Sequence, residues 1–274
     1  MFTHPPRTAH MVKTADGTLL AVREWGHPHG QPVLFIHGYA QTGLSFVQQV
    51  EAPELSHLRL VTFDLRGHGV SDKLLAPESY QTSTRWADDI AALIDQCALP
   101  APILVGWSYG GRIISDYLAR YGSERLSGLV FVDAVTENAR HFYGACNRLM
   151  KLMGDKDPAT CIAATRSFQR ACTLHPLDPD VFETLLAAAM MCPPEVRAAM
   201  ARPADYGRVL TDTHLPALVI HGADDAVIAP AMAVHIAGSL PHARLEIMEN
   251  TGHAPFLERP AAFNALLLDF INHL

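Results

Sequence analysis

The sequence predicts an α/β protein with a doubly wound, mostly parallel sheet and a helical cap inserted between strands six and seven. Three observations lead to this fold class. Short runs of consecutive apolar residues recur along the chain, as expected for strands that are covered on both faces. Amphipathic helical patterns alternate with these runs, which is typical of parallel sheets. One long stretch, residues 136–213, contains no convincing strand.

The strand pattern begins with a hairpin. Residues 10–25 contain two strand-like segments around Asp16-Gly17, a common pair in tight hairpin turns. The later strands are continuous apolar runs rather than alternating ones, which favours a parallel sheet. In chain order these runs are PVLFIHG (32–38), LRLVTFD (58–64), APILVG (101–106), LSGLVFVDA (126–134) and PALVIHG (216–222), and one further strand, ARLEIME (243–249), follows them.

Three amphipathic helices are the clearest of those between and after the strands. In each of them apolar residues recur every three or four positions, which places them on one face of a helix. We expect these faces to pack against the sheet. The apolar positions are Trp86, Ile90, Leu93, Ile94 and Cys97 in the first helix, Ile113, Ile114, Tyr117, Leu118 and Tyr121 in the second, and Phe263, Leu266, Leu267, Phe270 and Ile271 in the last.

The stretch without strands divides the chain into a core and an insertion. Residues 136–213 are rich in alanine, methionine, cysteine and arginine, and proline interrupts their helix-compatible segments. We interpret them as a helical cap over the C-terminal edge of the sheet. The α/β core then comprises residues 1–135 and 214–274.

Composition excludes several classes of protein. The chain has 274 residues, of which 49% are hydrophobic and 18% charged, so it can bury a core without disulfides and is not disordered. With a net charge of −7, the chain lacks the basic surface that nucleic-acid binding requires. We find no secretory leader, no run of 18 apolar residues and an odd number of cysteines, five. We therefore expect a cytoplasmic protein with reduced thiols and no membrane partner.

The strongest chemical signal is the GxSxG pattern GWSYG at 106–110. An apolar strand precedes it, and a helical pattern that contains a third glycine, Gly111, follows it. In this context the pattern predicts a strained strand-to-helix turn that holds Ser108 above the sheet, at the positive end of the helix. Side chains two residues to either side of the serine would clash in such a turn. We therefore expect Ser108 to be a nucleophile.

A serine nucleophile needs a base, and the base needs a carboxylate that orients it. His253 is the candidate base because it lies in a loop between a strand and the last helix. Asp224 and Asp225 follow another strand at the same edge of the sheet, and one of them should orient the imidazole. The fifteen histidines show neither an HExxH pattern nor a cluster with zinc spacing, so no metal and no cofactor is expected.

Taken together, these motifs resemble the α/β-hydrolase superfamily, and within it the branch of esterases, cofactor-free haloperoxidases and C–C hydrolases. The resemblance covers nearly the whole chain outside the predicted cap. It implies that the acid is Asp225, three residues after Gly222, although Pro230 follows one residue later than is usual in the family. Asp224 stays an alternative, and Asp133 is a third candidate, for which we favour a structural role. The matching motifs are HGY (37–39), DLRGHGVSD (64–72), GWSYGG (106–111), GADD (222–225) and GH (252–253).

The resemblance also implies an oxyanion hole. Its two donors would be the backbone N–H groups of Tyr39 and Tyr109, and His37 would support the loop that carries Tyr39. The segment RGHGVSD (66–72) would shape a loop beside the site. We assign no catalytic role to its charged residues, which could pair with neighbours, or to His68.

In the resembling family the insertion forms the roof of the substrate pocket. Its aromatic and methionine side chains favour loosely defined apolar ligands, so we expect a small to medium, largely apolar acyl or alcohol group. The predicted substrate-binding residues are Tyr39, Trp107, Phe142 and Met150. Arginines of the cap could instead bind a substrate carboxylate, and these are Arg140, Arg148, Arg166 and Arg170.

The predicted function is that of a serine carboxylesterase that forms an acyl-enzyme with a small-molecule substrate. The same three side chains could instead serve C–C bond hydrolysis, lactone opening or peracid formation. The fold could also serve a ligand receptor with a slow triad, because a fold alone does not fix a function. Family members with aspartate as the nucleophile are disfavoured by Ser108. The sequence leaves the oligomeric state open, a homo-oligomer included.

Overall fold

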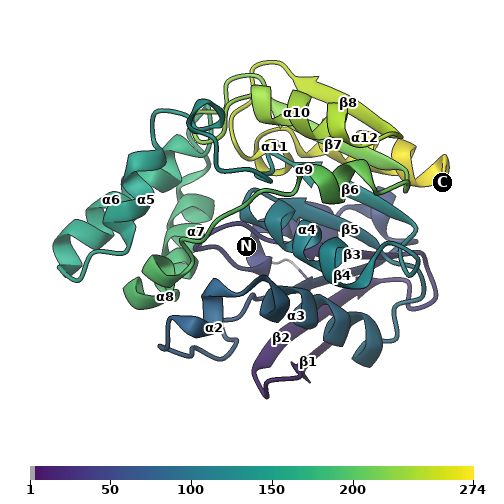
Figure 1. Ribbon diagram of the computed structural model, residues 1–274, viewed down its shortest axis with the longest axis horizontal. Coiled ribbons are helices and arrows are strands. Elements are labelled where there is room, and N and C mark those ends of the chain that lie inside the picture. The colour runs from purple at the N-terminus through teal and green to yellow at the C-terminus, as the bar shows by residue number, and fades with distance from the viewer. Residues whose placement is uncertain (1–3) are drawn as a thin grey trace.

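The computed structural model describes residues 4–274, which form one eight-stranded sheet with helices on both faces (Figure 1). The strand order is β1-β2-β4-β3-β5-β6-β7-β8. Strand β2 runs antiparallel to both β1 and β4, and every other neighbouring pair is parallel. The predicted fold class, a mostly parallel, doubly wound sheet, is therefore confirmed.

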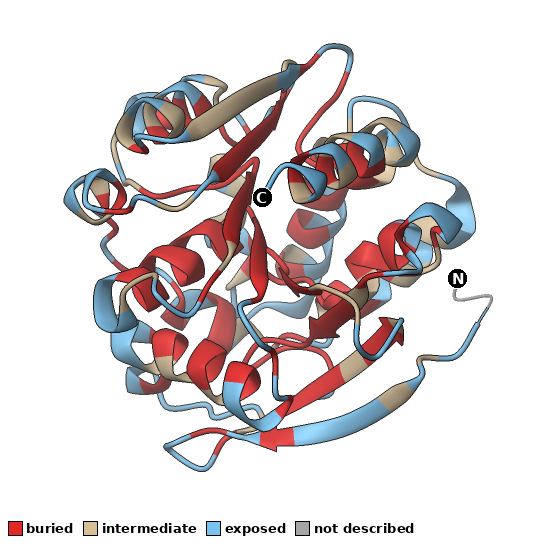
Figure 2. Ribbon diagram, turned by 90° about the vertical axis from the view of Figure 1, so that its right-hand side faces the viewer, coloured by how far each residue is buried: buried red, intermediate tan, exposed pale blue. Residues whose placement is uncertain are grey.

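Each predicted strand is present, within a few residues of its expected ends. The central parallel strands β3, β5, β6 and β7 are buried at every position, whereas the outermost strand β1 is largely exposed (Figure 2). This contrast explains why the central strands are continuous apolar runs. The strands are β1 (Thr8–Lys13), β2 (Leu19–Gly26), β3 (Pro32–Ile36), β4 (Arg59–Phe63), β5 (Ile103–Trp107), β6 (Gly128–Val132), β7 (Ala217–Gly222) and β8 (Ala243–Met248).

The three amphipathic patterns correspond to α3, α4 and α12. Helix α10 has no strong apolar stripe in its sequence, AMAVHIAGS, and was not predicted. The longer helices are α3 (Ser83–Gln96), α4 (Tyr109–Tyr121), α6 (Pro158–Ala171), α7 (Pro179–Met190), α10 (Ala231–Ser239) and α12 (Pro260–Asn272). The shorter ones are α1 (Val47–Val50), α2 (Glu78–Gln81), α5 (Asn147–Met153), α8 (Pro194–Ala199), α9 (Gly207–Thr211) and α11 (Pro255–Glu258), with 3₁₀ turns η1 (Gly43–Phe46), η2 (Pro53–Leu55) and η3 (Arg140–Phe142).

Two apolar clusters fill the space on the two faces of the sheet. Alternate residues of β3 belong to different clusters: Leu34 and Ile36 pack with residues of α3 and α4, and Val33 and Phe35 pack with residues of α12. This alternation is the period of two that a strand imposes on its side chains. The sheet is therefore buried on both sides, and its C-terminal edge is left for the loops that carry the candidate site.

Helices α5 to α9 lie between β6 and β7, and Figure 1 shows α5 to α8 grouped to one side of the sheet. Prolines that interrupt the sequence pattern begin helices here, because Pro158 and Pro194 occupy first-turn positions where no backbone N–H is needed. Across residues 136–213 the described backbone forms only isolated bridges and no strand. We keep the proposal that this segment acts as a cap. No helix within residues 4–274 combines the length and the hydrophobicity needed to cross a bilayer.

Candidate active site

Ser108 occupies the sharp turn between β5 and α4 that the GxSxG pattern predicts. Its backbone has φ 54° and ψ −113°, which few residues other than glycine adopt. A Cβ atom at Gly106 would lie 2.7 Å from the carbonyl oxygen of Gly110, and one at Gly110 would lie 2.4 Å from that of Ile36. Both glycines are thus required by the close approach of backbone segments. The turn leaves Ser108 at the wall of a cavity.

His253 and Asp225 form a buried hydrogen-bonded pair. Nδ1 of His253 lies 2.7 Å from Oδ2 of Asp225, and the two side chains come from the loops after β8 and β7. The other oxygen of Asp225 accepts hydrogen bonds from the backbone N–H groups of Val227 and Ile228 at 2.7 and 3.0 Å. These two backbone hydrogen bonds fix the orientation of the carboxylate, which in turn holds the proton of the imidazole on Nδ1.

The carboxylate of Asp225 is ionised at neutral pH. Burial alone would raise its pKa, but the imidazoles of His253 and His221 outweigh burial and hold the pKa well below its usual range. An ionised carboxylate at Nδ1 leaves Nε2 of His253 as the basic nitrogen. That nitrogen is buried and has no hydrogen-bond partner within residues 4–274.

Of the three candidate acids, Asp225 is the one that hydrogen-bonds to His253. Asp224 is exposed, and its backbone N–H donates to the carbonyl of Thr251 at 2.9 Å. Asp133 is fully buried after β6, where one of its oxygens accepts the N–H of Gly222 at 2.8 Å. Asp133 therefore ties the end of β6 to β7, in line with the structural role favoured for it.

A second buried histidine, His221 in β7, lies behind the pair and was missed by the sequence reasoning. Its Nε2 donates to the carbonyl of Ile228 at 3.1 Å and lies 3.3 Å from Oδ2 of Asp225, while Nδ1 lies 3.6 Å from Asp133. Burial disfavours the charged imidazole, but Asp133 and Asp225 outweigh it and raise the pKa of His221 to about 9. Burial and the nearby charge of Asp225 in turn raise the pKa of Asp133 to about 7.

This arrangement predicts that the protein loses stability in alkaline solution. The folded state keeps the proton of His221 up to about pH 9, whereas the unfolded chain loses it near 6.5, so the stabilisation is complete below pH 6.5 and is lost as the pH rises through 9. Urea unfolding at pH 7, 8 and 9 should show the unfolding free energy falling by about 1 kcal/mol per pH unit. His221→Gln should flatten this slope, and the same change at the exposed His242 should not. Equal slopes in His221→Gln and the wild type would contradict the assignment.

The segments that carry Ser108 and His253 are in contact, although no hydrogen bond joins these two side chains within the described residues. Trp107, which directly precedes Ser108, donates from Nε1 to the carbonyl of His253 at 2.7 Å, and the two rings are 5.6 Å apart. Hydrogen bonds between a nucleophile and its base are often long before substrate binds. That Nε2 of His253 serves as the base for the Ser108 hydroxyl stays a prediction.

The loop that carries Tyr39 runs directly beside the serine. A Cβ atom at Gly38 would lie only 3.1 Å from Cβ of Ser108. His37 braces this loop: its Nδ1 donates to the carbonyl of Gly38 at 2.9 Å, and its Nε2 accepts the N–H of Leu65 at 2.9 Å. Burial lowers the pKa of His37 to about 4, and the neutral ring is the form that this pair of contacts needs. The predicted supporting role of His37 matches this geometry.

The two predicted oxyanion donors have backbone N–H groups free to bind a ligand. Neither the amide of Tyr39 nor that of Tyr109 donates a hydrogen bond to any residue in the range 4–274. Tyr109 is the first residue of α4, so its N–H has no partner inside the helix. Tyr109 directly follows Ser108, and Tyr39 follows Gly38, which approaches Ser108, so the oxyanion role predicted for the two amides stays a prediction.

A cavity of about 710 Å³ opens at the serine, between the sheet and the inserted helices. Of the predicted substrate-binding residues, Tyr39 and Met150 line it, and Trp107 and Phe142 are not among its lining residues. The Trp107 ring packs against Phe256 at 4.9 Å, and Phe142 packs against His141 and His235. These two rings are used in packing, and neither is part of the cavity lining.

The basic residues at the cavity also differ from those expected. None of the four cap arginines named from the sequence lines it. The lining residues instead include Arg112 and Lys151, together with Arg197 and Arg202. Arg112 belongs to α4 rather than to the insertion.

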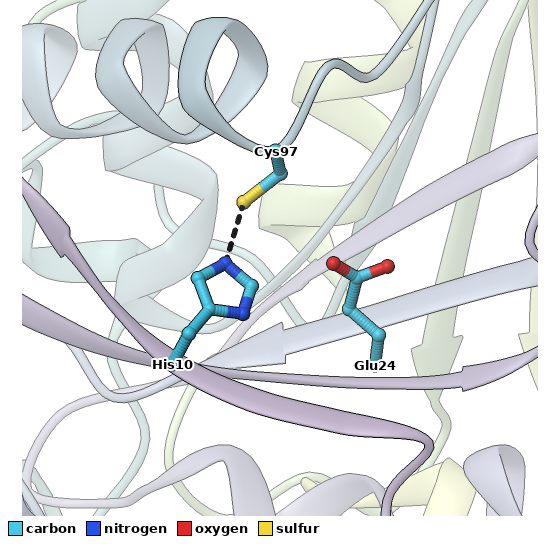
Figure 3. A group of neighbouring side chains, drawn as sticks. All are labelled: His10, Glu24 and Cys97. Carbon is cyan, nitrogen blue, oxygen red and sulfur yellow. Dashed lines mark hydrogen bonds between the residues drawn. The ribbon is translucent and has the colours of Figure 1, made fainter.

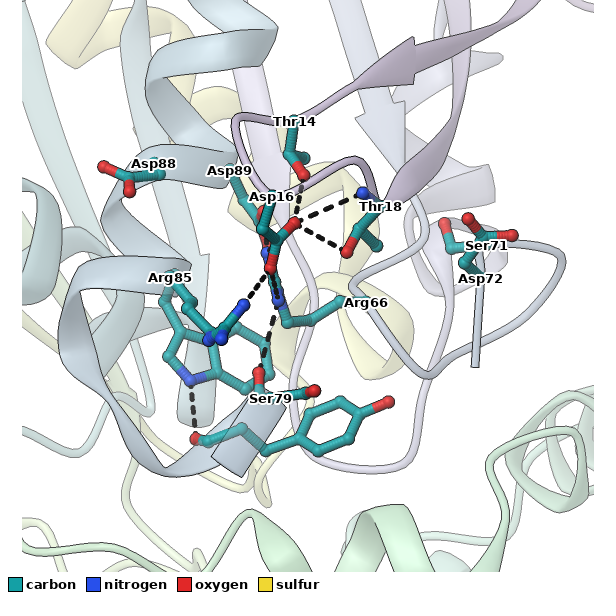
Figure 4. Close-up of polar contacts among 12 residues, drawn as sticks. Thr14, Asp16, Thr18, Arg66, Ser71, Asp72, Ser79, Arg85, Asp88 and Asp89 are labelled. Atoms are coloured by element: carbon teal, nitrogen blue, oxygen red, sulfur yellow. Dashed lines mark hydrogen bonds and ion pairs between the residues drawn. The ribbon is translucent and has the colours of Figure 1, made fainter. Parts of the chain in front are cut away.

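The segment 66–72 has a structural role, as expected. Figure 4 shows Arg66 between the carboxylates of Asp16 and Asp89, at 2.9 and 2.6 Å. Asp72 accepts the backbone N–H of Leu19 at 2.8 Å. These contacts fasten the loop after β4 to the β1–β2 hairpin and to α3.

Two groups of side chains within residues 4–274 have the residue types of a metal site. The first is His10, Glu24 and Cys97, drawn in Figure 3, but Glu24 there is already paired with Arg7 and Arg59 at 2.7 and 2.8 Å. The second group, Asp133 with Asp225 and His253, contains the acid–base pair itself. The donors of both groups are therefore engaged in contacts of their own.

Comparisons with known proteins agree with the resemblance drawn from the motifs. A family model described as the alpha/beta hydrolase family matches residues 33–266. The chain is similar to a protein of Burkholderia cenocepacia that is provisionally called an aryl esterase, with 37% identity, a TM-score of 0.94 and coverage of 97% of this chain and 98% of that one. It is similar to the esterase RhEst1 from Rhodococcus sp. ECU1013, with 32% identity, a TM-score of 0.89 and coverage of 96% and 98%. It is also 27% identical to the non-heme chloroperoxidase CPO-A1 of Kitasatospora aureofaciens, over 94% of this chain and 98% of that one.

Proposed function

Because the chain belongs to the alpha/beta hydrolase family, we propose that it is a serine hydrolase that cleaves carboxylic esters through an acyl-enzyme. The observation that carries this proposal is the buried pair of His253 and Asp225, 2.7 Å apart, which is joined through the His253 carbonyl to Trp107, next to the strained turn at Ser108. The similarity to two esterases supports the choice of substrate bond.

The proposed reaction begins with Ser108. His253 takes the proton of the Ser108 hydroxyl on Nε2 while the oxygen attacks the ester carbonyl, and Asp225 stabilises the imidazolium that forms. The amides of Tyr39 and Tyr109 would hold the negative oxygen of the tetrahedral intermediate. The imidazolium then gives its proton to the leaving alcohol, which departs and leaves an acyl group on Ser108. Water attacks that group with the same base and releases the acid.

The cavity suggests the size of the substrate. Its volume of about 710 Å³ lies within the range of sites that hold small organic ligands. Apolar side chains from the core and from the inserted helices line much of it, among them Val135, Met150, Met200 and Ile228. A small to medium acyl or alcohol group with apolar surface therefore fits, and the inserted segment 136–213 would act as its cap.

A second candidate reaction is peracid formation. The similarity to a non-heme chloroperoxidase favours it as a side activity of the same site. In that reaction hydrogen peroxide replaces water at the acyl-enzyme, so an ester and peroxide give a peracid and an alcohol. It needs no residue beyond those named for hydrolysis.

A substrate panel tests the proposed function. The protein should hydrolyse p-nitrophenyl acetate and butyrate with multiple turnovers, as followed by release of p-nitrophenolate. A vinylogous diketone, the substrate type of a C–C hydrolase, should not be cleaved at a comparable rate. Cleavage of the diketone without ester hydrolysis would assign the site to C–C bonds, and stoichiometric release without turnover would indicate a receptor.

A further inference from the structure

Basic side chains gather around the cavity although the chain as a whole is acidic. The protein has a net charge of −7, yet no aspartate or glutamate is among the described residues that line the cavity. The charged lining residues are Arg112, Lys151, Arg197 and Arg202. A cavity lined by one sign of charge attracts ligands of the opposite sign.

Three of these four cations have evident partners. Arg202 forms an ion pair with the buried carboxylate of Asp116. Arg197 is 1% exposed and donates to the backbone carbonyls of Met153 and Ala189, which ties the inserted helices together. Lys151 is exposed, so water solvates its ammonium group. Arg197 has no carboxylate partner and its Nε has no partner in the described chain, but the hydroxyl of Thr165 is a third acceptor for its terminal nitrogens, at 2.7 Å.

Arg112 is buried without a carboxylate, as Arg197 is, but it has fewer acceptors. It is 5% exposed, and no acidic side chain within residues 4–274 forms an ion pair with it. One terminal nitrogen donates to the carbonyl of Arg202 at 3.1 Å, the other donates to Oδ1 of Asn138, and Nε has no partner. Its other neighbours are neutral as well: the guanidinium lies over the Tyr109 ring, 5.4 Å from the ring centroid, and beside the hydroxyl of Tyr143. A buried cation in this state is costly unless an anion joins it.

The buried carboxylate of Asp116 is not free to serve as that anion. Asp116 lies close enough for Arg112 to lower its pKa, although burial outweighs this and raises the pKa to about 6. Both oxygens of Asp116 are already occupied, one by Arg202 and the other by Arg202 and Tyr206. A carboxylate bound in the cavity would supply the charged partner that Arg112 lacks within the described residues.

We propose that Arg112 is the anion-binding group of this cavity and that the preferred substrates are esters that also carry a carboxylate. The inference rests on the proposed ester hydrolysis and specifies its substrate class. Arg112 follows Ser108 by four residues in α4, one helical turn or about 6 Å along the axis, so a short carbon chain can separate the two groups. The planar guanidinium suits the two oxygens of a carboxylate, and the apolar walls suit the chain between.

Matched pairs of esters test this inference on the wild type. The substrates are the monoethyl esters of succinate, glutarate and adipate, each compared with the ethyl ester in which a carboxamide replaces the free carboxylate. Ester cleavage is followed by titration of released acid. We expect kcat/KM to be about tenfold or more higher for the carboxylate than for the carboxamide at one or more chain lengths. A ratio near one at all three lengths would overturn the inference.

Variants assign the preference to Arg112. Arg112→Gln should lower the carboxylate-to-carboxamide ratio to about one, mainly through KM, whereas the same change at the exposed Arg208 should leave the ratio as in the wild type. If the glutamine variant does not fold, Arg112→Lys takes its place. This variant keeps the charge but loses the planar fork, so its carboxylate-to-carboxamide ratio should lie between one and the wild-type value. A ratio that survives in both Arg112 variants would overturn the assignment.

Binding separates a failure of this inference from a failure of the proposed function. Calorimetric titration of Ser108→Ala with monoethyl adipate and with its carboxamide counterpart needs no catalysis. Tighter binding of the carboxylate with no ester cleavage by the wild type would support Arg112 and reject ester hydrolysis. Ester cleavage with equal binding of the two compounds would support hydrolysis and reject Arg112 as the anion site.

Discussion

Asp225→Asn is expected to lower kcat for ester hydrolysis about 10³- to 10⁴-fold while the protein stays folded. The asparagine has nearly the same shape, but it carries no charge to stabilise the His253 imidazolium. Its amide N–H can also turn toward Nδ1, which would place the imidazole proton on Nε2, where the serine proton has to go. Steady-state kinetics on p-nitrophenyl butyrate, with circular dichroism to check folding, measure the effect.

The same substitution at two other aspartates shows whether the loss of activity is specific to Asp225. Asp224→Asn should retain activity within about twofold, since surface changes of this kind are usually near neutral. Asp133→Asn should cost less activity than Asp225→Asn, because Asp133 holds the N–H of Gly222 rather than the imidazole. A collapse in Asp224→Asn together with an active Asp225→Asn would contradict the assignment of the acid.

Ser108→Ala is expected to lower kcat by about 10⁴-fold or more, because no acyl-enzyme can then form. The variant keeps the positive φ of the turn and removes one oxygen at the cavity wall, so its melting temperature should change little. Ser239→Ala, in α10 and remote from the cavity, is the matched control and should be as active as the wild type. Equal rates for Ser108→Ala and the wild type would exclude the serine mechanism.

Sequence reasoning recovered the sheet, the helices that cover it and the turn at Ser108. The reason is physical: each of these features leaves a local signature. Buried parallel strands need unbroken apolar runs, and the tight turn needs glycine at 106 and 110, where backbone segments approach within 2.7 and 2.4 Å of a Cβ. The pairing of His253 with Asp225 could be proposed because both follow strands that end at the same edge of the sheet.

Other features could not be predicted because they depend on contacts between distant elements. His221 lies within an apolar strand, and only the fold places it between Asp133 and Asp225. The sequence signal for a special role of this residue was a histidine within an otherwise apolar predicted strand. Arg112 was not predicted for a similar reason. It lies on the helix after the nucleophile, whereas the arginines named from the sequence all lie in the insertion. Trp107 was expected in the cavity, but its ring faces Phe256 and the His253 loop.

Covalent labelling with a fluorophosphonate, followed by peptide mass spectrometry, tests most directly whether the Ser108 oxygen is an activated nucleophile. We expect one adduct per chain, located on Ser108, formed rapidly in the wild type and absent in Ser108→Ala. Labelling of Asp225→Asn should be much slower, since its imidazole is no longer oriented. An unlabelled wild type, or an adduct on another residue that persists in Ser108→Ala, would contradict the account.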